Sequence, residues 1–250
     1  MFDFINLLGI ATQPAITPAH ILTAINTTRP DYQRSAFFTA AKLLPANFSG
    51  VAGQQTFVQN YNNAFAEAIV NIARYTSFNQ ALQLPQKDHV MVCGWFFPEL
   101  IQYIQRTVSL YNVLVLVSED APWFSNLKAA GNTLNFQQPD SFASLTTQMQ
   151  SGRNIFSMLD NIHAGTRSIN ATFFGGTIPI PSAILDLAIQ NNYTLAFLVP
   201  DGGATVVTAT IPATGQTAVQ LANWYSANLS HAVAANPARW LMWPALRSAM

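Results

Sequence analysis

Apolar residues recur along this 250-residue chain in two different patterns, and the change between them falls near residue 85. Before that point, side chains such as Phe57, Tyr61 and Phe65 recur at the spacing of one helical face. The helices predicted from this spacing, from Pro in a first turn and from composition cover residues 17–25, 31–44 and 54–82. We therefore expect residues 1–84 to form a helical section.

Beyond residue 85, short apolar runs alternate with amphipathic segments of about a dozen residues. Strands are predicted at 89–96, 112–117, 133–137, 154–159, 168–174, 193–199 and 206–211, and helices at 98–110, 123–130, 139–150, 182–190, 217–234 and 238–248. This alternation predicts an α/β fold, with a mostly parallel mixed sheet covered by helices on both faces. We expect a single domain over residues 1–250, with residues 85–250 as its α/β core.

Charge is scarce in this chain. Only 9% of the residues are charged, against an average of about 25% in soluble proteins, and the formal net charge is zero. Such a surface does not attract a nucleic-acid backbone, and it favours self-association into a homo-oligomer. The four His residues show no metal-ligand spacing, and no phosphate-binding loop is present, so we predict neither a metal nor a cofactor.

The lone cysteine and the lengths of the apolar runs bear on location. Cys93 cannot form an internal disulfide, which points to a reducing compartment. The apolar run 4–10 is much shorter than the ~20 residues that span a bilayer. We expect a cytoplasmic protein with no transmembrane segment, whose membrane contact, if any, is peripheral at the inner membrane.

The most informative motif runs from Asn170 through Phe173-Phe174-Gly175-Gly176-Thr177, with Asp160 ahead of it. Together with the closing run Pro237-Ala238-Arg239-Trp240-Leu241-Met242-Trp243, it resembles the lipid A late acyltransferases of the lysophospholipid acyltransferase superfamily. That family carries His-x-x-x-x-Glu or Asp at the end of an early strand. The corresponding segment here contains Glu99, but Gly94 stands at the His position and Cys93 lies beside it.

The resemblance implies a base that takes a proton from the acceptor hydroxyl, and glycine cannot do this. Cys93 is the predicted substitute, because a thiol near a helix start is favoured as thiolate. His163 is its predicted base, and Asp160 or Glu99 would orient the imidazole. The plainer interpretation is that Cys93 packs in the core, that His163 caps a turn, and that the two acids serve only local structure.

A second predicted set of residues would hold substrate. Glycines at Gly175 and Gly176 would let a thioester approach backbone N–H groups, with Phe174 and Thr177 beside them. Arg167 would meet an anionic group, or lie solvated in a loop. Clustered aromatic residues, namely Trp95, Phe96, Phe97, Phe173 and Phe174, would line an acyl pocket or pack in the core.

The family uses acyl groups carried by acyl carrier protein or coenzyme A, so the resemblance implies such a donor. We therefore expect an acyltransferase that acts on a soluble acceptor in lipid or specialised-metabolite biosynthesis, through an acyl-enzyme at Cys93. Two alternatives stay open at this point: a non-catalytic relative that binds an acyl chain or carrier protein, and a Cys-dependent thioesterase.

Overall fold

The computed structural model describes residues 40–41, 50–74, 84–85, 88–100, 104, 107–108, 111–117, 125–136, 138–160, 167–201, 204–243 and 246. The predicted helix 17–25 lies outside these residues, and only residues 40–41, which are helical, belong to the predicted helix 31–44.

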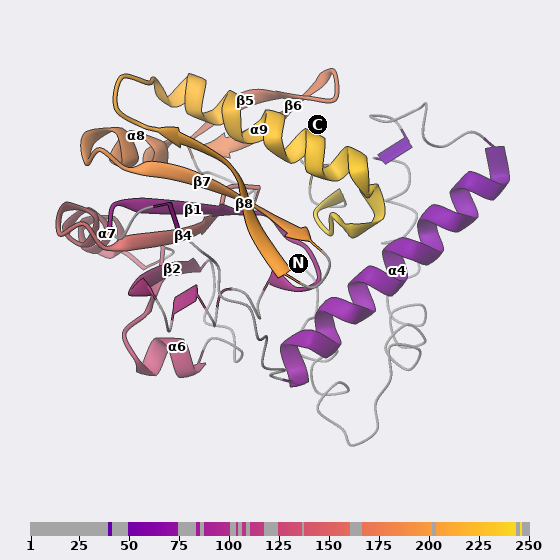
Figure 1. Ribbon diagram of the computed structural model, residues 1–250, viewed down its shortest axis with the longest axis horizontal. Coiled ribbons are helices and arrows are strands. Elements are labelled where there is room, and N and C mark those ends of the chain that lie inside the picture. The colour runs from indigo at the N-terminus through magenta and orange to yellow at the C-terminus, as the bar shows by residue number, and fades with distance from the viewer. Residues whose placement is uncertain are drawn as a thin grey trace.

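A six-stranded sheet forms the centre of the molecule (Figure 1). Its strands are β1 (Val90–Gly94), β2 (Val113–Val117), β3 (Thr133–Asn135), β4 (Asn154–Met158), β7 (Thr194–Asp201) and β8 (Ala204–Pro212), in the spatial order β3-β2-β4-β1-β7-β8. All neighbours pair in parallel except β7 and β8, which pair in antiparallel register. The prediction of a mostly parallel mixed sheet is confirmed.

Helices cover this sheet from both sides. They are α6 (Ser125–Ala129), α7 (Ser141–Gln150), α8 (Ser182–Gln190) and α9 (Ala218–Ala235), followed by the short 3-10 helix η3 (Pro237–Arg239). Figure 1 shows α9 near β5 and β7, and α6 near β2 toward the other end of the strand order. β1 and β2 are buried at every position, as expected for strands covered on both faces.

The long helix α4 (Gly50–Arg74) matches the predicted helical section in part. Its buried face includes Phe57, Tyr61 and Phe65, the apolar positions that predicted it. The Tyr61 hydroxyl donates a hydrogen bond of 3.0 Å to the carbonyl of Leu241. This helix therefore packs against the closing segment, which we define as residues 237–243.

Strands β5 (Ser168–Phe173) and β6 (Gly176–Pro181) form a separate antiparallel hairpin. The second strand was not predicted, because it contains Pro179 and Pro181, which usually argue against a strand. A hairpin of only two strands tolerates them, since each strand has a free edge. Its turn consists of Phe174 and Gly175, both with positive φ (48° and 78°), as a type I′ turn requires.

The closing segment differs from the predicted helix over 238–248. It has one 3-10 turn, after which Trp240 adopts an extended backbone with φ −84° and ψ 109°. The extended residue directs its indole into the core, where it is fully buried. Within the described residues the helix prediction is therefore wrong for the start of this segment.

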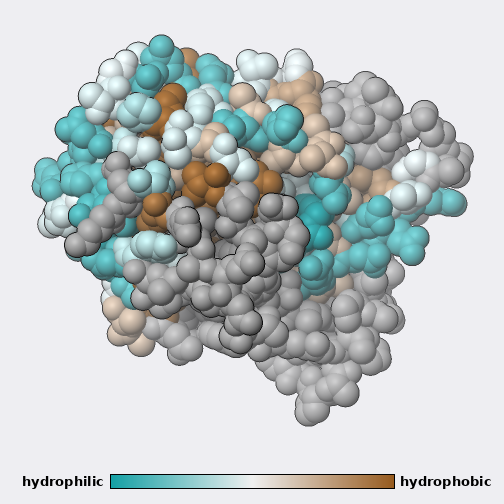
Figure 2. Space-filling model, viewed as in Figure 1, coloured by the Kyte–Doolittle hydropathy of each residue, from teal (hydrophilic) through white to brown (hydrophobic). Residues whose placement is uncertain are grey.

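Hydrophilic residues spread over much of the face seen in Figure 2, and hydrophobic residues gather near its middle, where Figure 1 places β7 and β8. The partly buried Val199, Val207 and Ile211 belong to these two strands. β8 is the outermost strand of the described sheet, and its register against β7 shifts between Phe197 and Leu198.

Helix α9 begins with a capping box. Thr217 Oγ1 accepts a hydrogen bond from the Gln220 backbone N–H, and Gln220 Oε1 accepts one from the Thr217 N–H. We expect Thr217→Ala to lower the free energy of unfolding by about 1 kcal/mol, because both end bonds are weakened. Urea denaturation measures this, and Thr217→Ser should behave like the native protein. An alanine variant of unchanged stability would contradict the cap's contribution.

Candidate functional site

The sheet's connections separate at the carboxyl ends of β1 and β4. The strand that follows β1 in the chain is β2, which lies beyond β4 on one side of β1. The main-sheet strand that follows β4 is β7, which lies beyond β1 on the other side. Right-handed crossovers in opposite directions run over opposite faces. The ends of β1 and β4 therefore form a switch point, where open α/β sheets usually bind ligands.

Asp160 is the charged side chain at this point, directly after β4. It is fully buried, and its Oδ2 accepts hydrogen bonds from the Phe96 backbone N–H at 3.0 Å and from Trp240 Nε1 at 2.8 Å. Oδ1 has no hydrogen-bond partner. Burial raises the pKa of Asp160 to about 6, although both hydrogen bonds favour the carboxylate.

Glu99 contacts an arginine of the closing segment. Arg239 donates to Glu99 Oε1 and also lies 3.5 Å from Glu67 of α4, so one guanidinium bridges two carboxylates. Burial raises the pKa of Glu67, and the nearby charge of Glu99 raises it further. The closing segment thus contacts both predicted acidic site residues, Glu99 through Arg239 and Asp160 through Trp240.

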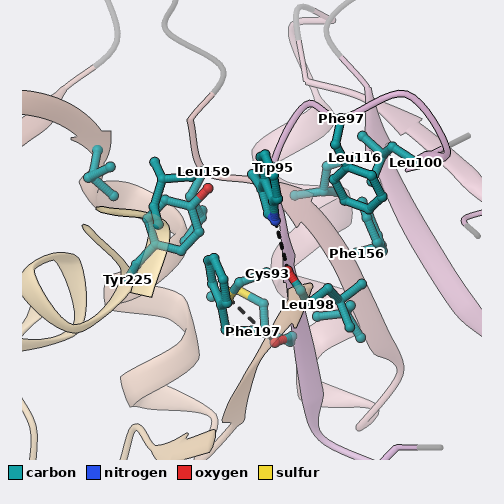
Figure 3. Packing of buried hydrophobic residues seen from close by; sticks show 14 of the residues in the cluster. Cys93, Trp95, Phe97, Leu100, Leu116, Phe156, Leu159, Phe197, Leu198 and Tyr225 are labelled. Atoms are coloured by element: carbon teal, nitrogen blue, oxygen red, sulfur yellow. Dashed lines mark hydrogen bonds between the residues drawn. The ribbon is translucent and has the colours of Figure 1, made fainter. Parts of the chain in front are cut away.

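Cys93 lies in the middle of the core. Its side chain is fully buried beside Phe197, and its Sγ donates to the Met91 carbonyl at 3.6 Å (Figure 3). Burial raises the pKa of the thiol well above its ordinary value, the reverse of the change that a nucleophile needs. The geometry thus favours the interpretation of Cys93 as a core residue.

Gly94 and Cys93 point to opposite faces of the sheet, because successive residues of a strand alternate. A Cβ at Gly94 would lie 2.6 Å from Cζ of Phe156 and 3.4 Å from the Leu100 side chain. On the other face, the Tyr225 hydroxyl of α9 donates to the Gly94 carbonyl at 2.8 Å. The thiol is therefore next to the motif position in sequence but cannot replace its side chain in space.

We expect the Cys93 thiol to react with Ellman's reagent at least about 10³ times more slowly in the native protein than in denaturant. A fully buried strand residue is exposed only by an opening close to global unfolding. Absorbance after mixing reports the rate, and Cys93→Ala gives the background. Rapid reaction of one thiol per native chain would contradict the burial.

The predicted glycine-rich site lies in the hairpin and not at the carboxyl edge of the main sheet. Phe174 and Gly175 form the β5–β6 turn, and Gly176 and Thr177 begin β6, where Phe173 pairs with Gly176 and Thr172 with Thr177. The expectation that these residues follow a strand of the main sheet is wrong. The hairpin instead packs through Phe173 onto Trp240, with ring centroids 5.1 Å apart.

Arg167 and the aromatic cluster have clear surroundings. The Arg167 side chain is 82% exposed and lies 3.8 Å from Asp186, as expected for a solvated surface residue. Trp95, Phe97 and Phe173 are buried in the core, whereas Phe96 and Phe174 are partly buried. Trp95 Nε1 donates to the Leu198 carbonyl (Figure 3). Within the described residues, these rings therefore pack in the core or against it.

His163 lies outside the residues that the structure describes, so its predicted pairing with Cys93 stays a prediction. Sequence reasoning missed the polar roles of Arg239, Trp240 and Tyr225. The first two belong to the closing motif. Charged residues are rare in this chain, so an arginine close to two tryptophans was a signal that could have identified an ion pair. Nothing in the sequence singled out Tyr225.

Metal ligands and membrane-spanning helices are both missing from the described part of the chain. It contains no group of three or more His, Cys, Asp or Glu side chains that could hold a metal ion. None of its helices combines the length and apolar character that crossing a bilayer requires.

Comparison of the sequence with models of protein families finds no match, and neither does comparison with curated proteins.

Proposed function

We propose that this chain is a non-catalytic relative of the acyltransferases, which binds an acyl chain or its carrier, acyl carrier protein or coenzyme A, without transferring the acyl group. The ligand class comes from the resemblance of the segments 170–177 and 237–243 to the lipid A acyltransferases. The lack of catalysis comes from the geometry at the switch point.

The observation that carries the proposal is the space next to Gly94. The Phe156 ring fills the volume into which a side chain at this position would extend, since an added Cβ would approach it to 2.6 Å. Real Cβ atoms do not approach a ring carbon so closely, so an imidazole does not fit here without a change in Phe156. Position 94 thus has neither a side chain that can accept a proton nor the space for one.

The other groups of the motif already have structural partners. Glu99 is neutralised by Arg239, and the Cys93 thiol is buried on the opposite face of β1. The thiol is not exposed to an acyl donor in the structure, so a covalent route through Cys93 is disfavoured both for transfer and for hydrolysis. Arg239 of the closing segment instead joins Glu99, which follows β1, to Glu67 of α4, and this role is structural.

Titration with acylated carrier protein and with acyl-coenzyme A tests the proposal. Calorimetry should show saturable binding to at least one donor, and mass spectrometry should show no thioester consumption above that with an inert protein. Unacylated carrier protein is the control that separates recognition of the chain from recognition of the carrier. Turnover that Cys93→Ala or Asp160→Asn abolishes would overturn the proposal, as would lack of binding.

Asp160 favours a second candidate, an acyltransferase that works in one step. It is a buried carboxyl with a pKa near 6, and its Oδ1 lacks a partner at the switch point. As a general base it would take the proton of an acceptor hydroxyl while that oxygen attacks the thioester carbon and the donor thiol leaves. In that case Asp160→Asn should reduce transfer by about 10² to 10⁴, with Cys93→Ala fully active. Equal rates in the Asp160→Asn variant and the native protein would exclude this candidate.

A further inference from the structure

A polar hollow of about 380 Å³ lies at the opposite edge of the sheet from the candidate site. Four of its lining residues lie just before parallel strands. Asp88 stands two residues before β1, and the residues directly before β2, β3 and β4 are Asn112, Asn132 and Arg153. The hollow is thus built from the loops at the amino ends of four adjacent strands.

Arg153 is the distinctive side chain of the hollow. Its guanidinium donates to Asn132 Oδ1 at 2.6 Å, to Gln148 Oε1 at 3.1 Å and to the Gly131 carbonyl at 3.3 Å. All three acceptors are neutral, and among the described residues no carboxylate lies within ion-pair distance of it. The charge of this half-buried cation is therefore not neutralised by the described protein.

The guanidinium also has donors to spare. Arginine offers five N–H groups, and three are used by the contacts above. The Nε atom is buried and has no hydrogen-bond partner. Burial disfavours the positive charge and so lowers the pKa of Arg153. A nearby anion would relieve this cost.

The remaining lining suits a small polar molecule. Asn112 and Ser151 add amide and hydroxyl groups, whereas Asp88 places a carboxylate in the same hollow. A small anion in the hollow would be attracted by Arg153 and repelled by Asp88, so it would bind on the Arg153 side. An apolar ligand does not fit, because it would cover the polar groups of Asn112 and Ser151 without offering them hydrogen bonds.

We propose that this hollow binds a small oxyanion, a phosphate or a carboxylate, beside Arg153. The site is separate from the switch point and does not depend on the function proposed above. Its main contacts come from the loops at 130–132 and 151–153.

Titrations with inorganic phosphate and with acetate, each against sodium chloride at the same ionic strength, test the proposal. In NMR spectra of the native protein, backbone amides at 130–132 and 151–153 should shift in a saturable way with at least one of the two anions. Saturation by phosphate alone would identify a phosphorylated ligand, and saturation by acetate alone a carboxylate.

Variants at Arg153 give the second arm of the test. Arg153→Gln should weaken anion binding at least tenfold, and Arg153→Lys should weaken it less because it keeps the charge. Arg167→Gln is the matched control at an exposed arginine, and binding should stay within twofold of the native value. Binding that Arg153→Gln leaves unchanged would overturn the proposal. So would native spectra without saturable shifts in these loops, a result that does not depend on the folding of any variant.

Discussion

Replacing Trp240 with alanine should lower the free energy of unfolding by about 3–5 kcal/mol, the usual cost of truncating a buried aromatic residue. The indole is fully buried and packs against Phe173 and Trp243, with ring centroids 5.1 and 4.6 Å apart. Its Nε1 also donates to Asp160, so the variant leaves a buried carboxylate with one partner fewer. Urea denaturation measures the loss.

Two variants separate these contributions. Trp240→Phe keeps most of the packing and removes the hydrogen bond, so it should cost about 1–3 kcal/mol. Trp224→Ala is the matched control, because Trp224 lies in α9 and is only partly buried. If Trp224→Ala cost as much as Trp240→Ala, the contacts at the switch point would have no special weight.

The stability of the protein should fall by about 2 kcal/mol between pH 4 and pH 7 through Asp160 alone, because a change of one in pKa corresponds to about 1.4 kcal/mol and part of the effect lies below pH 4. Burial raises the pKa of this carboxyl from 3.8 to about 6, so the folded state holds the proton more tightly than the unfolded state. The resulting stabilisation is complete below the unfolded pKa and is lost as pH rises through the folded pKa.

The difference between the native protein and Asp160→Asn isolates this effect from the other titrating groups. The variant cannot ionise at position 160, so its free energy of unfolding should lack the decline between pH 4 and pH 7. Parallel profiles for the native protein and Asp160→Asn would contradict the raised pKa.

The strands and helices of the α/β core could be predicted because each depends on a local pattern. A parallel strand buried on both faces is a continuous apolar run, as Val113–Val117 is, and this signal does not depend on the partner strands. The hairpin strand β6 lacks such a signal. Its two prolines have the opposite local preference, and its pairing with β5 comes from the turn at Phe174 and Gly175.

The candidate site depends on contacts between distant residues, which the sequence alone does not show. Alternation along a strand already implied that Cys93 and Gly94 point to opposite faces. It did not show that α9 covers one face, with Tyr225 against the Gly94 carbonyl, or that Phe156 fills the other. In the same way, one of the two acidic partners of Arg239, Glu99, lies 140 residues away in the chain.

The contact between Gly94 and the Phe156 ring also restricts the mutational routes open to this chain. A histidine at position 94 collides with the ring, and removing the ring first leaves a buried cavity that costs about 3–5 kcal/mol. Both single steps are harmful, although the double change relieves the collision. Because most domains are stable by only about 5–15 kcal/mol, each intermediate would be strongly selected against. An imidazole at position 94 therefore requires two simultaneous substitutions or a prior gain in stability.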